Sequence, residues 1–227
     1  DPEPFMNERK MFSPRGKMLG GCSSHNGMVH VRGNAMDFEN WGQLGLSNWN
    51  YENVLPYFKK SESIEGLDTE YRNTDGPLKL SRTENGNILS KIYLEAAAQA
   101  GYEINNDMNG YKQEGFGLMD TTIFDGKRQS TSVTYLHPIK QRQNLTLITN
   151  VQVSKIIIEN SSAVGVEIKN KNKLEKIFIE KEVLLSAGAI NSPQILMLSG
   201  VGPEEELKNH GIKVISSLNG VGENLQD

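Results

Sequence analysis

The stretch Val183-Leu-Leu-Ser-Ala-Gly-Ala-Ile-Asn-Ser-Pro193 indicates the fold class of this 227-residue chain. Residues 183–187 are almost continuously apolar, as expected of a strand that is buried on both faces in a parallel sheet. Two small residues follow, and Ser192 as an N-cap with Pro193 at the first helical position predicts the start of a helix that packs through Ile195, Leu196 and Leu198. In α/β sheets such a strand, turn and helix start lie beside the bound ligand.

Short strands precede this stretch. Residues 145–148, 151–158, 164–168 and 174–179 are rich in β-branched side chains, partly alternating, and separated by short polar connections. This pattern predicts a meander of antiparallel strands. The predicted fold class is therefore α/β with α+β character.

The first half of the chain carries helical patterns. Asn50 can cap a helix that presents Val54 and Phe58 and ends at two lysines, and a second helix is predicted over residues 88–100, before Gly101. Its apolar residues, at positions 88, 89, 92, 93 and 96, fall on one face. Glycines and acidic residues dominate positions 105–127, with short extended pieces over residues 118–124.

The composition excludes several classes of protein. With 37% hydrophobic residues, 23% charged residues and a formal net charge of -4, the chain can form one or two cores and has no basic surface typical of nucleic-acid binding. No apolar run is long enough to span a membrane. A single cysteine, Cys22, excludes an intrachain disulfide. The four histidines lack metal-ligand spacing, so no metal site is predicted.

A second distinctive segment is Pro14-Arg-Gly-Lys-Met-Leu-Gly-Gly-Cys-Ser-Ser-His-Asn-Gly27. Its paired glycines allow a flat ligand to approach the backbone, whose N–H groups can bind carbonyl and phosphate oxygens. Alone, this segment could be an ordinary loop, and residues 187–203 could be a capped helix that follows a buried strand.

Together the two segments resemble the two sequence signatures of the glucose–methanol–choline (GMC) oxidoreductases. The resemblance covers nearly the whole chain. Segments similar to the animal branch of the family are Val31-Arg-Gly-Asn34, Asp37-Phe-Glu-Asn-Trp41, Leu55-Pro-Tyr-Phe-Lys-Lys60, Gly76-Pro-Leu78, Gly115-Phe-Gly117, Arg142-Gln-Asn-Leu145 and Gly222-Glu-Asn-Leu-Gln-Asp227.

The resemblance implies a two-domain, FAD-dependent oxidoreductase that acts on the CH–OH group of an alcohol or sugar. A Rossmann-type domain binds FAD, and a second domain with an antiparallel sheet covers the substrate. Hydride passes from the alcohol carbon to flavin N5, and oxygen or a quinone then accepts the electrons. Residues 1–40 would form a flavin-covering segment of the FAD domain, residues 41–144 would belong largely to the substrate domain, and residues 145–227 would supply FAD-domain strands and helices.

Individual family positions can be carried over. The resemblance places the following residues against FAD: Met18, Gly20, Gly21, His25, Asn26, Gly27, Met28, Val29, Val153, Ala187 and Gly188. The backbone of Val153 corresponds to the position that meets the adenine. Cys22 is expected to be a small buried residue against the flavin.

His25 allows two interpretations. The sequence Cys22-Ser-Ser-His-Asn26 resembles the choline-oxidase form of the loop, in which the histidine is bonded covalently to the flavin 8α-methyl group. Alternatively, His25 packs beside the flavin or hydrogen-bonds a loop carbonyl. The other histidines, at positions 30, 137 and 210, are expected to have packing or helix-terminal roles.

Two family features are missing from the chain. The Gly-x-Gly-x-x-Gly motif is absent, since Gly200-Val-Gly202 and Gly220-Val-Gly222 lack its third glycine, and we expect it before Asp1. The catalytic histidine is expected beyond Asp227, so no catalytic residue is assigned and the isolated chain is expected to be inactive. A non-catalytic flavin- or ligand-binding relative is the alternative, and a short structural protein is a third. The substrate is not identified, and secretion is only a family expectation.

Overall fold

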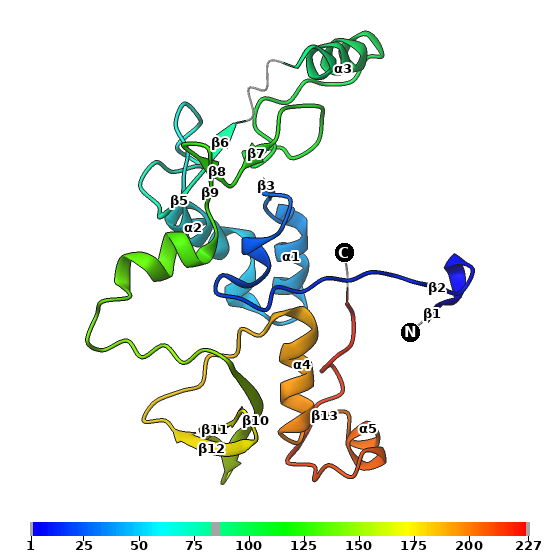
Figure 1. Ribbon diagram of the computed structural model, residues 1–227. Coiled ribbons are helices and arrows are strands. Elements are labelled where there is room, and N and C mark those ends of the chain that lie inside the picture. The colour runs from blue at the N-terminus through cyan, green and yellow to red at the C-terminus, as the bar shows by residue number, and fades with distance from the viewer. Residues whose placement is uncertain (1, 83–86, 226–227) are drawn as a thin grey trace. The chain divides into compact units, whose positions relative to one another are not determined.

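Two units make up the chain in the computed structural model, which describes residues 2–82 and 87–225. The first unit is Asp1–Leu145 and the second is Thr146–Asp227 (Figure 1).

The second unit contains the predicted meander. Strands β10 (Val151–Glu159), β11 (Ser162–Asn170) and β12 (Lys173–Phe178) are antiparallel in that order (Figure 1). Asn160 and Ser161, which connect the first two strands, have φ of 50° and 62°, as a two-residue type I′ turn requires. Three of the four predicted strands are thus confirmed. The fourth, at residues 145–148, is wrong: no described residue pairs with it, and an extended segment without a partner forms no ladder.

Helix α4 (Gly188–Leu198) contacts β10. The Ser199 hydroxyl, just beyond the helix, accepts a hydrogen bond of 2.8 Å from Ile156 N in β10 and donates one to Ile195 O. Ile195 and Ile156 are buried at this contact, as predicted for Ile195, whereas Leu198 is 46% exposed and does not belong to the packing face.

Short elements complete the second unit. Strand β13 (Val201–Gly202) pairs in parallel with β14 (Ser216–Ser217), and α5 (Glu204–Asn209) lies between them in sequence. The three glutamates of α5 occupy its first turn, where negative charge is favourable. Leu207, which is 1% exposed, fixes this helix to the unit.

The predicted strand at residues 183–187 is not formed. No described residue pairs with this segment, and Leu184 is 80% exposed. The apolar composition of residues 183–187 predicted that they lie between two neighbouring strands. Burial of this kind also requires strands that pair with the segment on both sides. The helix start also differs from the prediction, because α4 begins at Gly188 and Pro193 lies within it. Ser192 instead accepts a hydrogen bond of 3.0 Å from Ala187 N.

Each strand of the first unit, over the residues that the structure describes, has only two residues. They are β1 (Pro2–Glu3), β2 (Arg9–Lys10), β3 (Val29–His30), β4 (Glu62–Ser63), β5 (Leu78–Lys79), β6 (Ser81–Arg82), β7 (Asp120–Thr121), β8 (Ile123–Phe124) and β9 (Lys127–Arg128). Strand β7 lies between β3 and β6 in an antiparallel sheet, and β8 and β9 form a hairpin. These ladders supply few hydrogen bonds, so other interactions must stabilise the unit.

Two capped helices pack through aromatic side chains. Helix α1 (Ala35–Gln43) has a capping box formed by Asn34 and Asp37, and Asn50 caps α2 (Tyr51–Ser61), as predicted. The ring of Phe38 in α1 lies 5.5 Å from that of Phe58 in α2, at an edge-to-face angle.

The predicted helix at residues 88–100 is confirmed as α3 (Ile88–Gln99). Its apolar face does not pack as expected, since Leu89 is 68% and Tyr93 62% exposed, and Ala97 is the buried residue of the helix. Periodicity indicates which face can be buried, but not whether a partner covers it.

A buried cluster of charged side chains lies at the centre of the first unit. The Arg72 guanidinium, 1% exposed, donates to Glu62, Asp107 and Asp120. Its Nε lies 2.7 Å from Glu62 Oε1, and its Nη2 lies 2.8 Å from Asp120 Oδ2. A planar guanidinium presents donors in fixed directions, so it sets the relative positions of all three carboxylates.

Glu62 is fully buried and remains a carboxylate. Burial alone would raise its pKa, but hydrogen bonds from His30 and Arg72 and the positive charge of Arg32 lower the pKa to about 2. The Arg32 Nη2 atom lies 2.8 Å from Glu62 Oε1, and His30 Nε2 lies 3.2 Å from Oε2. The carboxylate is thus compensated from three sides.

We predict that Glu62→Gln lowers the unfolding free energy of the intact protein by about 3–5 kcal/mol, because it removes the carboxylate that faces Arg32 and one of the three that bind Arg72. The folded-state pKa of Glu62 lies below its ordinary value of 4.5, so its stabilising contribution is complete above pH 4.5 and is lost as the pH falls toward about 2. Urea unfolding at pH 7 and pH 3 measures both effects. The exposed Glu65→Gln variant is the control, and equal stability of the two variants would contradict the prediction.

Candidate functional site

Eight of the predicted cofactor residues lie in one tight loop, residues 18–29, hereafter the glycine-rich loop. It winds around a short 3-10 helix, η2 (Gly21–Ser24). Gly21 N donates to Met18 O at 2.9 Å, and Asn26 N donates to Cys22 O at the same distance. Gly20 and Gly21 have φ of 88° and 51°, so the turn requires left-handed backbone at both positions.

The two glycines have different surroundings. A Cβ atom on Gly20 would lie 2.3 Å from Ser24 Oγ and 3.2 Å from Ser132 Cβ, so this glycine faces protein. A Cβ atom on Gly21 or on Gly27 would meet nothing within 4 Å. Gly20 therefore marks a packed side of the loop. Gly21 and Gly27 mark an open side, where they offer a flat group backbone without side chains.

Other residues of the loop are exposed. Met18 is 56% and Val29 49% exposed. Cys22 is also exposed, and its sulfur accepts a hydrogen bond from Gly16 N at 3.4 Å. A flat cofactor against the loop would cover exposed apolar surface, so the residues present fit such a group.

His25 lies at the end of η2, and its ring is exposed. Its backbone N donates to Cys22 O at 3.1 Å, whereas its ring forms no hydrogen bond with any described residue. The proposed bond to a loop carbonyl is therefore not formed within the described part of the chain. Both ring nitrogens remain available to a ligand.

Asn26 and Met28 shape the loop from within. The Asn26 Oδ1 atom accepts hydrogen bonds from Met28 N at 3.2 Å and from Arg128 Nη1 at 2.7 Å. Met28 has φ of 64°, and its carbonyl accepts a bond of 2.8 Å from Thr122 N. These groups already accept hydrogen bonds within the protein, so they have less capacity to accept hydrogen bonds from a cofactor.

Three further predicted cofactor residues lie in the second unit. Val153 pairs with Ile168 in the meander, next to an irregularity of β10, and is 37% exposed. Ala187 N is occupied by Ser192 Oγ. Gly188 has φ of 93° and open space at its Cβ position, so its backbone is the more accessible of the two.

The remaining histidines have structural partners. His30 contacts Glu62, His137 Nε2 lies 3.3 Å from Ser132 Oγ, and His210 lies 3.1 Å from Glu206 one helical turn earlier. No group of metal-ligating side chains occurs among the described residues, and none of their helices is long and apolar enough to cross a membrane.

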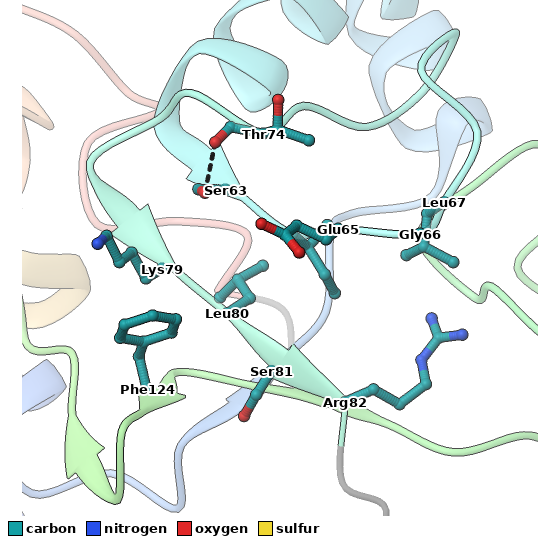
Figure 2. Close-up of a pocket in the computed structure, with 11 residues that line it drawn as sticks. Ser63, Glu65, Gly66, Leu67, Thr74, Lys79, Leu80, Ser81, Arg82 and Phe124 are labelled. Carbon is teal, nitrogen blue, oxygen red and sulfur yellow. Dashed lines mark hydrogen bonds between the residues drawn. The ribbon is translucent and has the colours of Figure 1, made fainter.

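A polar cleft of about 710 Å³ also opens in the first unit. Figure 2 shows Glu65, Lys79 and Arg82 among its lining residues. The Lys79 ammonium lies 4.6 Å from the ring centroid of Phe124. None of the predicted cofactor residues lines this cleft, and we assign it no role in cofactor binding.

The chain belongs to the GMC oxidoreductase family, whose N-terminal model matches residues 4–227. It is 48% identical to the oxygen-dependent choline dehydrogenase of Rhizobium etli and 47% identical to the mitochondrial choline dehydrogenase of mouse, both over all 227 residues. It spans 41% and 38% of those proteins. These relatives are bacterial and mammalian, so the similarity shows the family and does not single out the animal branch.

The structure also resembles solved flavoproteins. An FAD-dependent oxidoreductase from Chaetomium thermophilum superimposes with a TM-score of 0.92 at 30% identity, over 100% of this chain and 42% of that one. The described fold is thus a mixed α/β fragment that matches the N-terminal, FAD-binding region of the family.

We predict that Gly20→Ala destabilises the intact protein more than Gly21→Ala. Both substitutions place alanine at positive φ, which costs about 1–2 kcal/mol, but only the Gly20 variant also forces a Cβ atom against Ser24 and Ser132. Urea unfolding of the flavin-free protein measures the difference, with Gly21→Ala as the matched control. Equal stabilities of the two variants would contradict the close approach of Gly20 to Ser24 and Ser132.

Proposed function

We propose that the intact protein is an FAD-dependent oxidoreductase that oxidises the CH–OH group of a choline-like alcohol. The observation that carries the proposal is the open side of the glycine-rich loop, where Gly21 and Gly27 leave room for a flat group, in a chain of the GMC family. The names of the relatives favour a choline-like alcohol over glucose, aromatic alcohols or steroids.

FAD, when bound, supplies a hydride acceptor at flavin N5. We propose that Met18, Gly20, Gly21, His25, Asn26, Gly27, Met28, Val29, Val153, Ala187 and Gly188 hold it. Gly21 and Gly27 leave room for the flavin ring, Met18 and Val29 offer it exposed apolar side chains, and Gly188 offers accessible backbone. Gly20 acts from the packed side by shaping the turn. No residue of this chain is assigned as the catalytic base.

The proposed domain organisation follows the family. Residues 1–40 cover the flavin, residues 41–144 belong largely to the substrate domain with its antiparallel sheet, and residues 145–227 contribute to a Rossmann-type FAD domain. The division between the two units, at Leu145 and Thr146, lies beside the second of these boundaries and supports the proposal.

We propose oxygen as the electron acceptor, since the name of the Rhizobium relative specifies it, with a quinone as the alternative. The competing function is a non-catalytic relative that binds flavin or another ligand. It differs from the enzyme in one observable property, because a bound flavin would not be reduced by any alcohol.

We predict that the full-length protein carries FAD and that choline bleaches its absorbance near 450 nm under anaerobic conditions, roughly stoichiometrically with the flavin. Glucose at the same concentration is the control and should reduce it at least about tenfold more slowly. Bound flavin that neither alcohol reduces would favour the non-catalytic relative. Absence of flavin would reject both.

His25 is the proposed point of covalent attachment, because its ring is exposed and has no hydrogen-bond partner among the described residues. The full-length protein is expected to retain its flavin after acid precipitation, whereas His25→Ala releases it. His210→Ala, which also removes an exposed histidine, is the control and should retain the flavin. Release of all flavin from the wild-type protein would mean that FAD is bound non-covalently beside His25.

A further inference from the structure

The glycine-rich loop is attached to a segment about a hundred residues away in the chain. Arg128, in strand β9, donates from Nη1 to Asn26 O at 2.8 Å, to Asn26 Oδ1 at 2.7 Å and to Ser23 O at 3.2 Å. Ser23 lies in η2, and carbonyl groups at the end of a helix lack partners within it. A cation at this end can bind those carbonyls.

Thr131 makes a second attachment. Its backbone N donates to Ser23 Oγ at 3.0 Å, and its hydroxyl lies 3.2 Å from Ser23 Oγ and donates to Gly20 O at 3.3 Å. A third attachment joins Thr122 N to Met28 O. The loop is thus fixed at its start, middle and end by residues 122–131.

The segment that holds the loop is itself well defined. Strands β8 and β9 pair through Ile123 and Arg128, and their turn has positive φ at Asp125 and Gly126, which matches the twist of a two-residue hairpin. Gln129 N donates to Thr122 O at 2.8 Å and closes the base of the hairpin. The backbone of Arg128 is therefore held independently of the loop, and its guanidinium can impose a shape on the loop.

We propose that Arg128 is a positioning residue for the flavin: its guanidinium fixes the conformation of the glycine-rich loop and thereby holds His25 and the open glycines toward the cofactor. This inference rests on the proposed function. Arg128 acts through Ser23 and Asn26. Lysine cannot replace it fully, because an ammonium group is a compact point charge without the planar geometry of guanidinium.

The test compares Arg128→Ala, Arg128→Lys and Lys127→Ala in the full-length protein. Lys127 is the control, since it is an exposed cation on the same strand and its side chain forms no hydrogen bond or ion pair with the loop among the described residues. We expect Arg128→Ala to speed amide exchange of residues 20–26 and to raise the FAD dissociation constant, each by about tenfold or more. Arg128→Lys should give exchange rates and dissociation constants between those of wild type and Arg128→Ala, and Lys127→Ala should match wild type.

Two readouts separate positioning from a purely structural role. If Arg128 positions the loop, the flavin that remains in Arg128→Ala has a shifted absorption maximum, and added guanidinium, but not sodium, at millimolar concentration restores FAD affinity. A wild-type spectrum in the bound fraction, with loop exchange equal to that of Lys127→Ala, would overturn the inference. If Arg128→Ala does not fold, Thr131→Val tests the same loop through Gly20 and Ser23, with a smaller expected change in exchange and affinity.

The outcomes also separate this inference from the proposed function. Amide exchange of the loop can be measured in flavin-free protein, so it reports on Arg128 even if the wild-type protein binds no FAD. A wild-type protein without flavin would reject the proposed function and, with it, the role of Arg128 toward the cofactor. Normal flavin binding with unchanged loop exchange in Arg128→Ala would reject only the inference.

Discussion

The first unit depends on the buried guanidinium of Arg72. Its three carboxylate partners come from separate parts of the chain: Glu62 from β4, Asp120 from β7, and Asp107 from the loop after α3. The strands of this unit are two residues long, and its buried apolar residues are few, so neither ladders nor apolar packing alone fixes their arrangement. Directional ion pairs can do so, because a displaced partner leaves an uncompensated charge away from water, and that penalty exceeds the gain from most single contacts.

This cluster extends to the glycine-rich loop through β3. His30, immediately after the loop, contacts Glu62 with its ring and pairs with Asp120 through its backbone. The buried Asn109 amide donates both to His30 O and to Asp120 Oδ2, which ties the strand to the cluster a second time. The end of the loop is therefore anchored in the buried charges, while its body is anchored by the hairpin of β8 and β9. Together these contacts give a segment rich in small residues a single defined conformation.

The sequence predicted those features that depend on neighbours along the chain. The meander, the capped helix at Asn50 and the helix that ends before Gly101 follow from local periodicity and capping, and all three are formed. Residues 183–187 and the apolar face of α3 were wrongly predicted to be packed, because composition shows what can be buried and not what covers it. The roles of Glu62 and Arg128 were missed for a related reason. Glu62 contacts His30, 32 positions away, and Arg128 contacts Ser23, 105 positions away, and no local pattern marks a charged residue for such a contact.

The packed side of the loop also bears on cofactor affinity. The contacts described for the loop are made within the chain, so they can form when the protein folds and do not require a ligand. The entropic cost of ordering these residues is then met during folding, and the free energy of cofactor binding is not reduced by it. Gly21 and Gly27 gain their significance from this order, since open space beside a backbone helps a ligand only if the backbone stays in place. The small residues of the loop therefore describe only part of such a site. The other part consists of distant side chains, such as Arg128 and Thr131, that hold the loop in place.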